Sequence, residues 1–408
     1  MPITERTKRL KERCRFKHVA GGEYVDPEVR AGVERARYLT EAHKASVGQP
    51  VGISRAKGLE NVLKKMTIHI QEDELLVGAN TEHPEYFPLY PELSYFATVD
   101  MVESPYCEHK EEMREIAEYW RPYTIQTKGQ TYFTEEELDT SYSATIIQPP
   151  MFVTAFSSMI PNYETILEDG LEKRAETIQA KIDAASEKMR KSPWVAKDHL
   201  QYLDKIDKWK AMIIADKAAI AWAQRYSRLA KIIAENFETD NARKEELLEI
   251  SDICRHVPAK PPRGLRDAMQ CKWFTYLLCH SIERYASGYG QKEDKLMWPF
   301  YKKSVIDQIG QPMTRDEAQE LFECERLKVS EHGSTKGRQL REFFAGSNDL
   351  FILTLGGLNA DGSDGCNDCT DVILDAAVSM KTTEPSIGFR WNAIGREQTK
   401  RKVFECIK

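Results

Sequence analysis

The sequence predicts a helix-rich α/β protein, and three observations support this fold class. Apolar residues recur at helical spacing through most of 171–257. A strand, a turn, a helix and a second strand follow one another within 349–392, which is the order of a parallel βαβ crossover. The composition, with 41% hydrophobic and 30% charged residues among 408, is ordinary for a globular protein. A chain of this length holds one large domain or two or three smaller ones.

Charge and hydropathy argue against two classes of protein. The net charge of -6 lacks the basic footprint of a nucleic-acid binder. No apolar run approaches the roughly 18 residues that a membrane-spanning helix needs, and the basic N-terminus lacks the apolar core of a secretory signal. The nine cysteines, an odd number without the spacing of a disulfide framework, favour reduced thiols. We therefore expect a cytoplasmic protein that binds neither nucleic acid nor membrane.

The first part of the chain mixes helices with irregular structure. Residues 1–65 are expected to be helical, because 25–46 combine an acidic start with an apolar stripe of period 3.6. A short apolar strand is expected at 75–78. The segment that follows, rich in proline and aromatic residues, cannot be regular helix. Residues 100–145 are mixed and polar, and the sheet is expected to begin late in the chain.

The middle of the chain is apolar and then strongly helical. Residues 146–167 are low in charge and broken by prolines, which indicates buried loop and strand. Pro193 is expected to end the first long helix, since proline does not fit inside one. Two helical stripes surround this break, made first by Ile178, Ile182, Ala185 and Met189 and then by Trp222, Tyr226, Leu229 and Ile233.

The last third supplies the βαβ unit. Helices are expected at 265–285 and at 314–331, the second with Thr314 as N-cap. A buried strand at 349–357, a helix at 366–380 and a strand at 384–392 follow. The final residues continue an amphipathic helix without a stop signal, so we expect the sequence to be the first part of a longer chain.

Cys366 and Cys369 form a Cys-x-x-Cys at the start of a predicted helix. A structural zinc site would need a second pair of ligands, and the sequence offers none. Both cysteines extend the apolar face of the helix, so packing is the favoured interpretation. A redox role stays open, because a helix N-terminus lowers the pKa of a thiol.

The acidic turn before this pair resembles a calcium loop only superficially, since the glutamate at the twelfth position is missing. Gly356 and Gly357 are expected to allow positive φ at the end of the strand, and Asp364 or Asn367 to cap the helix. The glycines do not make a dinucleotide fingerprint, and the histidines have no metal-ligand spacing. The sequence therefore contains no self-sufficient catalytic constellation.

Three blocks of residues resemble one family in the right order. The first block, near the end of a long helix, is Arg225, Tyr226, Leu229 and Ala230. The second is Pro261, Pro262, Arg263, Ala268 and Gln270, with Asp267 where a glutamate is usual. The third is Gly356, Gly357, Gly362, Asp364, Asn367, Thr370 and Leu374. Together they resemble glycyl radical enzymes of the pyruvate formate-lyase superfamily, over about 55–390.

The resemblance implies the helix-rich N-terminal half of a ten-stranded α/β barrel. Residues 1–408 would be a partial domain, truncated before the catalytic cysteine loop and the C-terminal glycyl radical domain. None of the nine cysteines can then be the thiyl residue, so no catalytic residue is assigned in this chain. The resemblance also implies no bound cofactor, a protein glycyl radical on the missing part, a radical-SAM activating enzyme, a homo-oligomer and possible small accessory subunits.

Ser157 and Ser158 stand where diol-dehydratase-like members carry Gly-His. A missing buried donor argues against a polyol, and the surrounding residues are apolar and aromatic. The segment is similar to alkylsuccinate and benzylsuccinate synthases, which add a hydrocarbon to fumarate. We therefore expect that function, with substrate contacts from Phe152, Phe156, Ser158 and Tyr163. An apolar, dry pocket would protect the radicals.

Four alternatives remain. Within the family they are an arylacetate decarboxylase, which also holds an aromatic group, and a diol-dehydratase-type lyase. Outside the family, the chain could be a helical binding scaffold or a thiol–disulfide protein that uses Cys366 and Cys369. The half-barrel is not expected to fold well by itself, since it leaves strand edges open.

Overall fold

A computed structural model describes residues 3–14, 30–84, 86–103, 107–137, 140, 157–158, 160–283, 286–331, 351–382 and 384–407. The elements of the first half are α1 (Glu5–Cys14), β1 (Arg30–Gly32), α2 (Glu34–Ala45), α3 (Val51–Lys65), β2 (Tyr86–Pro88), α4 (Tyr95–Val102), α5 (Lys110–Trp120), α6 (Ile125–Gln130), β3 (Ser157–Ser158) and α9 (Tyr163–Lys191). Those of the second half are α10 (Ala196–Asn236), α11 (Asn241–His256), α12 (Leu265–Leu277), η1 (Leu278–Ile282), β4 (Ala286–Ser287), α13 (Glu293–Tyr301), η2 (Lys302–Ile306), α14 (Arg315–Glu331), β5 (Ile352–Gly356), α16 (Asp368–Met380), β6 (Ser386–Arg390) and α17 (Glu397–Ile407).

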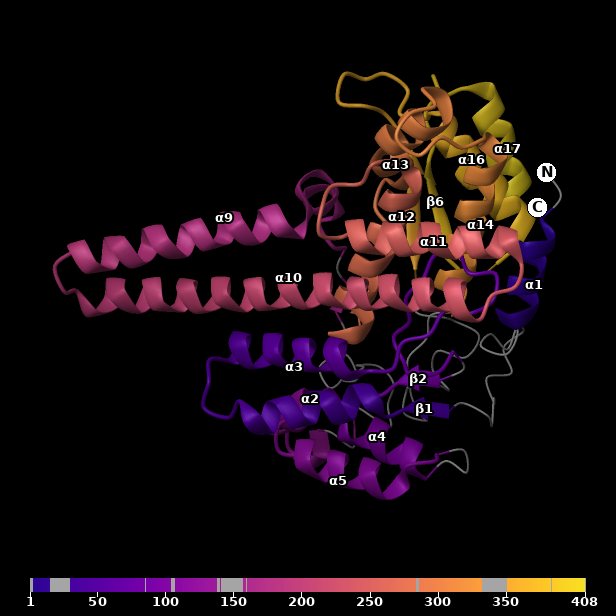
Figure 1. The fold of residues 1–408 in the computed structure, drawn as a ribbon. Coiled ribbons are helices and arrows are strands. Elements are labelled where there is room, and N and C mark those ends of the chain that lie inside the picture. The colour runs from indigo at the N-terminus through magenta and orange to yellow at the C-terminus, as the bar shows by residue number, and fades with distance from the viewer. Residues whose placement is uncertain are drawn as a thin grey trace.

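The long helix α10 runs through the molecule and separates two groups of elements (Figure 1). On one side lie α2, α3, α4, α5 and the strands β1 and β2. On the other side lie α11 to α17 with β5 and β6, and α1 packs there beside α14. Helices α9 and α10 continue beyond both groups as an antiparallel pair that projects from the body. Pro193 lies in the break between them, as the sequence predicts.

The strands β3, β4, β5 and β6 form two parallel pairs that lie side by side. β3 pairs with β4, and β5 pairs with β6. The segment that directly follows β4 joins the two pairs, because Gly290 N donates to Ile352 O at 3.2 Å and Thr354 N donates to Gln291 O at 3.2 Å. Sheet order is therefore β3, β4, β5, β6. The predicted βαβ unit is confirmed as β5, α16 and β6.

Helices cover one face of β5 and β6, and the described residues leave the other face of these two strands exposed. Leu353 and Leu355 of β5 are buried, and Ile387 and Phe389 of β6 pack against the same core cluster. Their neighbours on the opposite face of β6 are exposed, and Ile352 is 53% exposed. Parallel sheets are normally covered on both faces, so this face is where further structure or a ligand would lie.

Two expectations about the N-terminal part were wrong. The sheet content does not begin late, because β1 at Arg30–Gly32 already pairs in parallel with β2 at Tyr86–Pro88. Residues 75–78 form no strand. Instead, the side-chain amide of Gln270 on α12 makes the two backbone hydrogen bonds to Val77 that a neighbouring strand would otherwise make. Gln270 Oε1 accepts from Val77 N at 2.9 Å, and Gln270 Nε2 donates to Val77 O at 2.7 Å.

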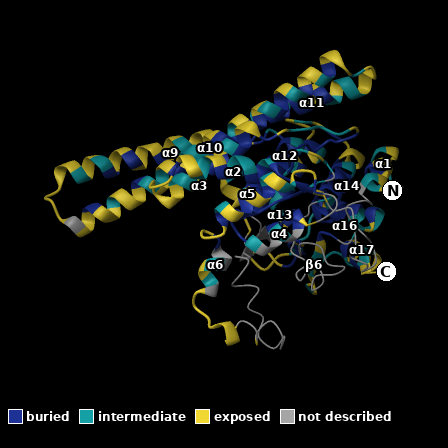
Figure 2. Cartoon of the chain, turned by 90° about the horizontal axis from the view of Figure 1, so that it is seen from below, coloured by how far each residue is buried: buried dark blue, intermediate teal, exposed yellow. Residues whose placement is uncertain are grey.

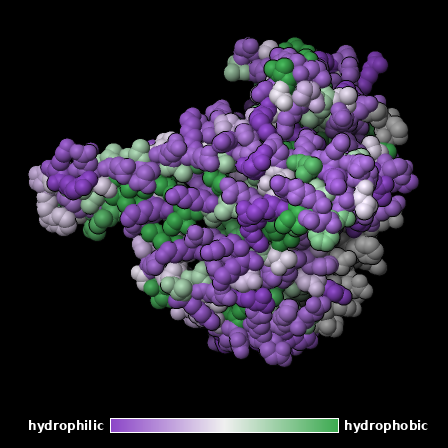
Figure 3. Space-filling model, viewed as in Figure 1, coloured by the Kyte–Doolittle hydropathy of each residue, from purple (hydrophilic) through white to green (hydrophobic). Residues whose placement is uncertain are grey.

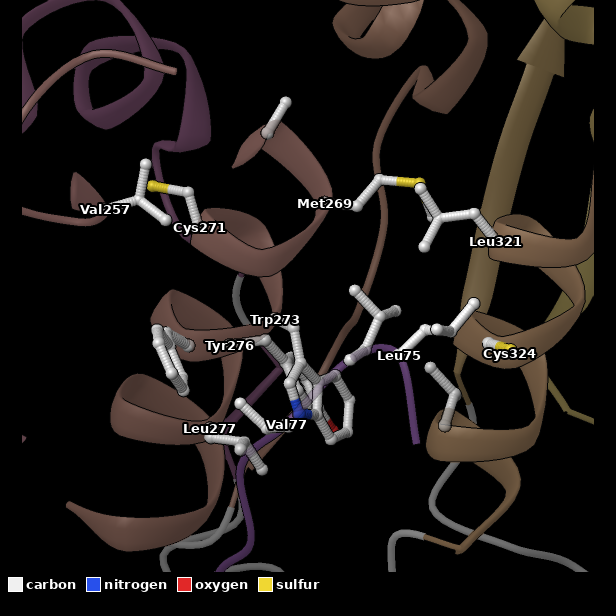
Figure 4. Packing of buried hydrophobic residues seen from close by; sticks show 14 of the residues in the cluster. Leu75, Val77, Val257, Met269, Cys271, Trp273, Tyr276, Leu277, Leu321 and Cys324 are labelled. Atoms are coloured by element: carbon white, nitrogen blue, oxygen red, sulfur yellow. The ribbon is translucent and has the colours of Figure 1, made fainter. Parts of the chain in front are cut away.

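The main core lies where this segment crosses α12 and α14. In Figure 4, Met269 and Cys271 leave opposite sides of α12 toward Leu321 and Val257, while Leu75 lies beside Cys324. Figure 2 shows the same contrast across the molecule, with buried residues concentrated in the body and exposed residues on the projecting helices. The amide of Gln270 therefore satisfies polar backbone groups inside an apolar core.

The first prediction concerns Gln270. Replacing it by methionine keeps the volume but leaves Val77 N and Val77 O buried without partners. We expect the free energy of unfolding, measured by urea denaturation, to fall by about 2–4 kcal/mol. The exposed Gln179→Met variant is the matched control and should change stability by less than about 0.5 kcal/mol. We call the two hydrogen bonds between the Gln270 amide and Val77 the Gln270 clamp. Equal effects of the two variants would contradict its proposed contribution to stability.

Candidate functional site

The structure places two of the four predicted substrate contacts. Ser158 lies on β3, where its backbone pairs with Ser287 of β4. Tyr163 is the first residue of α9 and is 1% exposed. Phe152 and Phe156 lie outside the described residues. Ser158 and Tyr163 thus lie at the β3 side of the parallel sheet, five residues apart in the chain.

Tyr163 connects α9 to the strand region that follows β4. Its hydroxyl donates a hydrogen bond of 2.9 Å to the backbone oxygen of Tyr289. Burial raises the pKa of the Tyr163 phenol well above its ordinary value, so the hydroxyl keeps its proton and remains a donor. Tyr163 is therefore placed to hold β4 beside β3.

A buried charge cluster lies beside the segment that follows β4. It comprises Lys272 on α12, Glu293 on α13, Glu325 on α14 and Tyr289 in that segment. Lys272 Nζ is 2.7 Å from Glu293 Oε2 and 3.0 Å from Glu325 Oε1. The Tyr289 hydroxyl also donates to Glu325 Oε1. Lys272 Nζ lies 4.0 Å from the centre of the Tyr289 ring, a cation–π distance. The cluster thus ties three helices to the strand after β4.

The cluster carries more negative than positive groups in a dry environment. Desolvation, opposed by Lys272 and reinforced by Glu325, raises the pKa of Glu293 to about 7. The pKa of Lys272 is also raised: desolvation lowers it, but the two carboxylates outweigh that effect. Lys272 therefore stays charged, and Glu293 gains or loses its proton near neutral pH.

Asp294, the next residue, fixes the end of β5 and the start of α16. Its Oδ2 accepts from Gly356 N at 2.8 Å and from the Thr370 hydroxyl at 2.7 Å. Asn367 caps α16 in a capping box with Thr370, which confirms one of the two predicted caps. Gly356 and Gly357 adopt φ of 70° and 84°, as expected.

The Cys-x-x-Cys is two free thiols. Cys369 is fully buried on the apolar face of α16, whereas Cys366 is half-buried just before the helix. Desolvation and the nearby Asp364 raise the pKa of Cys366 to about 12, and burial raises that of Cys369 well above its ordinary value. Burial therefore outweighs the helix N-terminus, and packing is the interpretation that the geometry favours over redox chemistry.

The residues that carry the family resemblance act mainly as structural anchors. Arg225 donates to the carbonyl oxygens of Leu63 and Met66, where α3 ends. Arg263 Nε donates 2.7 Å to Asp267 Oδ2, and Asp267 is fully buried. Together with the Gln270 clamp, these contacts hold α3, α12 and the segment near Val77 in one arrangement.

Within the described ranges, no group of three or more histidine, cysteine or acidic side chains is arranged to hold a metal ion. The helices of the described chain are also not long and apolar enough to cross a membrane.

Sequence reasoning missed the charge cluster, although it left a signal. Lys272 is the one charged residue in 268–279, a run that is apolar or aromatic apart from Gln270 and Thr275. A lysine at such a position indicates a buried partner, because an unpaired charge is rarely tolerated in a core. The identity of the partners, Glu293 and Glu325, could not be read from the sequence, since they lie 21 and 53 residues away.

Comparison with known families matches residues 3–408 to the model described as pyruvate formate lyase-like. Among curated proteins, the isethionate sulfite-lyase of Nitratidesulfovibrio vulgaris is 28% identical over 93% of this chain and 47% of its own length. The trans-4-hydroxy-L-proline dehydratase of Clostridioides difficile is 29% identical over 94% and 47%. The indoleacetate decarboxylase of Tractidigestivibacter scatoligenes is 25% identical over 100% and 48%.

Among solved structures, one described as 1,2-propanediol dehydration in Roseburia inulinivorans matches with a TM-score of 0.87 and 27% identity. That match covers 100% of this chain and 50% of the other. The predicted fold is thereby confirmed: the chain is a helix-rich α/β portion that matches half of a glycyl radical enzyme barrel. The chain spans about half the length of the curated relatives it matches.

The second prediction concerns Lys272. Its replacement by methionine leaves Glu293 and Glu325 buried without a counter-charge, so we expect stability at pH 8 to fall by about 3–5 kcal/mol. Lys302→Met breaks an exposed ion pair with Asp307 and should change stability by less than about 1 kcal/mol. Chemical denaturation of both variants is the measurement, and a tolerated Lys272→Met would contradict the cluster.

The third prediction is the pH dependence that Glu293 confers. Because its pKa in the folded state is about 7, above the ordinary 4.5, folding takes up a proton. The stabilisation is complete below about pH 4.5 and is lost as the pH rises through 7. Glu293→Gln removes this loss, so the stability of the variant relative to the parent should rise between pH 5 and pH 8. The exposed Glu397→Gln variant is the control and should show the same pH dependence of stability as the parent protein. If Glu293→Gln also shows the parent's pH dependence, the assignment of this titration to Glu293 is wrong.

Proposed function

Because the chain belongs to the pyruvate formate lyase-like family of glycyl radical enzymes, we propose that it is the N-terminal portion of the catalytic subunit of a radical lyase. The reaction we propose is elimination of a leaving group from a small polar substrate, of the dehydratase or carbon–sulfur lyase type. The observation that carries this proposal is the chemistry named for the matched relatives, among them a sulfite-lyase and dehydratases.

In such enzymes a protein glycyl radical supplies hydrogen-atom abstraction through a cysteine, and both residues would lie outside this chain. Installation of that radical needs a radical-SAM activating enzyme, and we place the pair in the anaerobic cytoplasm. The residues of this chain would bind and orient the substrate and exclude water.

We assign the substrate to the exposed face of β5 and β6, at the side where β3 and β4 continue the strand order. Phe152, Phe156 and Ser158 are proposed to contact it. Tyr163 is better described as a positioning residue, since its ring is buried and its hydroxyl is engaged by Tyr289 O. The buried charge cluster would support the same strand from behind.

Addition of a hydrocarbon to fumarate is the second candidate. Ser157 and Ser158, in place of a glycine–histidine pair, and the apolar residues around them favour it. None of the relatives described above is named for this reaction, whereas the dehydratase and decarboxylase alternatives each have a named relative. We therefore rank elimination first.

The fourth prediction tests the reaction class. The full-length protein, activated anaerobically by its radical-SAM partner, should show a glycyl radical by electron paramagnetic resonance and should eliminate sulfite from isethionate or water from a vicinal diol or hydroxyproline. Air should abolish the signal. Succinate adducts formed from toluene or hexane with fumarate, without elimination products, would reverse the ranking.

Side-chain variants then test the assigned surface. Phe156→Ala and Ser158→Ala should raise KM about tenfold or more, because each removes a direct substrate contact. Tyr132→Ala, at a position 85% exposed, is the control and should leave KM unchanged. Unchanged KM in all three variants would remove this face from the proposal while leaving the reaction class intact.

A further inference from the structure

Arg390 is the last residue of β6 and lies at the carboxyl end of the β5–β6 pair, in register with Gly356. Successive residues of a strand point to opposite faces. Ile387 and Phe389 pack against the core cluster, so Arg390 belongs to the exposed face, and its side chain is exposed. In open α/β sheets, ligands bind outside the carboxyl ends of the parallel strands. Arg390 therefore places a guanidinium group at the edge of the assigned substrate surface.

An exposed arginine is by itself ordinary on a surface that is largely hydrophilic (Figure 3). What distinguishes Arg390 is the space that the neighbouring turn leaves for it. Gly357 has a φ of 84°, and a Cβ atom at this position would lie 3.2 Å from Arg390 Cβ and 3.4 Å from Arg390 Nε. The Arg390 side chain therefore extends from β6 toward the turn that follows β5, over a residue that has no side chain.

The backbone beneath this side chain is held by several hydrogen bonds. Gly357 N donates to Arg390 O at 2.8 Å, and Gly357 O accepts from Asn392 Nδ2 at 3.0 Å. The preceding residue is also fixed, because Gly356 N donates to Asp294 Oδ2 at 2.8 Å. A charged group on such a rigid base can bind a ligand without ordering a mobile loop first.

The guanidinium group of Arg390 makes no ion pair or side-chain hydrogen bond with the residues that the structure describes. The acidic side chains of the adjoining turn are already engaged, since Asp361 accepts from Ser363 at 2.6 Å and Asp364 accepts from Asn392 at 3.1 Å. The exposed face of β5 and β6 adds no acidic residue; its other members include Ile352, Thr354, Ser386 and Gly388. The positive charge of Arg390 is therefore available to a ligand.

Lys292 adds a second positive charge beside this face. Its backbone bridges Thr354 in parallel, and Thr354 in turn pairs with Gly388 of β6. Adjacent strands are about 4.8 Å apart, so the backbone of Lys292 lies about 10 Å from that of Gly388. The Lys292 side chain is exposed and, in the described part of the chain, has no ion-pair partner. The local potential therefore favours a negatively charged ligand.

We propose that Arg390 binds an anionic group of the substrate, a carboxylate or a sulfonate. A planar guanidinium group donates two parallel hydrogen bonds to such a group, and a neutral alcohol cannot accept them in the same geometry. Arg390 thereby selects anionic substrates over neutral diols. This inference rests on the proposed function, from which it takes the substrate surface, and it adds the class of substrate.

Isothermal titration calorimetry of the full-length protein before activation tests the proposal, with propane-1-sulfonate, butyrate and 1-butanol as probes. At least one of the two anions should bind about tenfold more tightly than 1-butanol, and their comparison shows which anionic group is preferred. Arg390→Gln should weaken binding of that anion about tenfold or more and leave binding of 1-butanol unchanged. Arg390→Lys should recover part of the loss, since lysine keeps the charge but lacks the planar fork.

Arg401→Gln is the matched control. Arg401 is an exposed arginine on α17, which packs against α16, and its replacement removes the same charge from another surface. Anion binding should be unchanged in this variant. Circular dichroism should show equal melting temperatures for the parent and both glutamine variants, since both arginine side chains are exposed.

In the activated enzyme, Arg390→Gln should raise KM for an anionic substrate about tenfold or more with kcat changed by less than about threefold, because the contact is made in the ground state and the transition state alike. Anions that bind no more tightly than 1-butanol, or that bind Arg390→Gln as well as the parent, would overturn the proposal. Preference for a neutral diol would overturn it while leaving the reaction class intact. Anion binding that depends on Arg390, in an activated protein that yields no elimination product, would support this inference and contradict the proposed reaction.

Discussion

The ammonium group of Lys272 is buried in the core of this protein, and the surrounding helices place two carboxylates within ion-pair distance of it. An unpaired charge in such a place would cost many kcal/mol, so the ammonium requires partners with close geometry. Glu293 and Glu325 supply them from two other helices. Because Tyr289 donates to Glu325, the same contact fixes the chain directly after β4. The relative positions of α12, α13, α14 and the parallel sheet therefore depend on one buried cation.

This constraint extends from the core to the proposed substrate surface. Tyr289 O accepts from Tyr163, which begins α9 a few residues after β3. Asp294, next to Glu293 in the chain, holds Gly356 at the end of β5 and Thr370 at the start of α16. Buried polar groups thus determine where β3, β4 and β5 lie, while the proposed substrate surface is the exposed face of β5 and β6. Rigid support of this kind is what a radical enzyme needs, since a misplaced radical reacts with the wrong atom.

The sequence predicted the parts of the fold that local patterns determine. Pro193 follows the end of α9, Thr314 and Asn367 lie at helix starts, and Gly356 and Gly357 have positive φ at the end of β5. Each of these features depends on neighbouring residues. The strand β1 was missed, since three residues carry almost no periodicity. The apolar run at 75–78 predicts a strand, but its actual backbone partner, the Gln270 amide, is 193 residues away in the chain and could not be found from local pattern. The charge cluster was not predicted for the same reason, since its members are far apart in the chain. The substrate preference was inferred from Ser157 and Ser158, and the neighbouring Phe152 and Phe156 lie outside the described residues.

The central claim is that substrate binds on the open face of the sheet beside β3, in front of the strand that the charge cluster supports. A crystal structure of the full-length protein with a bound substrate or product tests it most directly. The account predicts that the ligand lies within about 4 Å of Ser158 and on the face opposite Leu353 and Leu355. A ligand bound elsewhere, with the β3–β4 face packed against protein side chains, would contradict it.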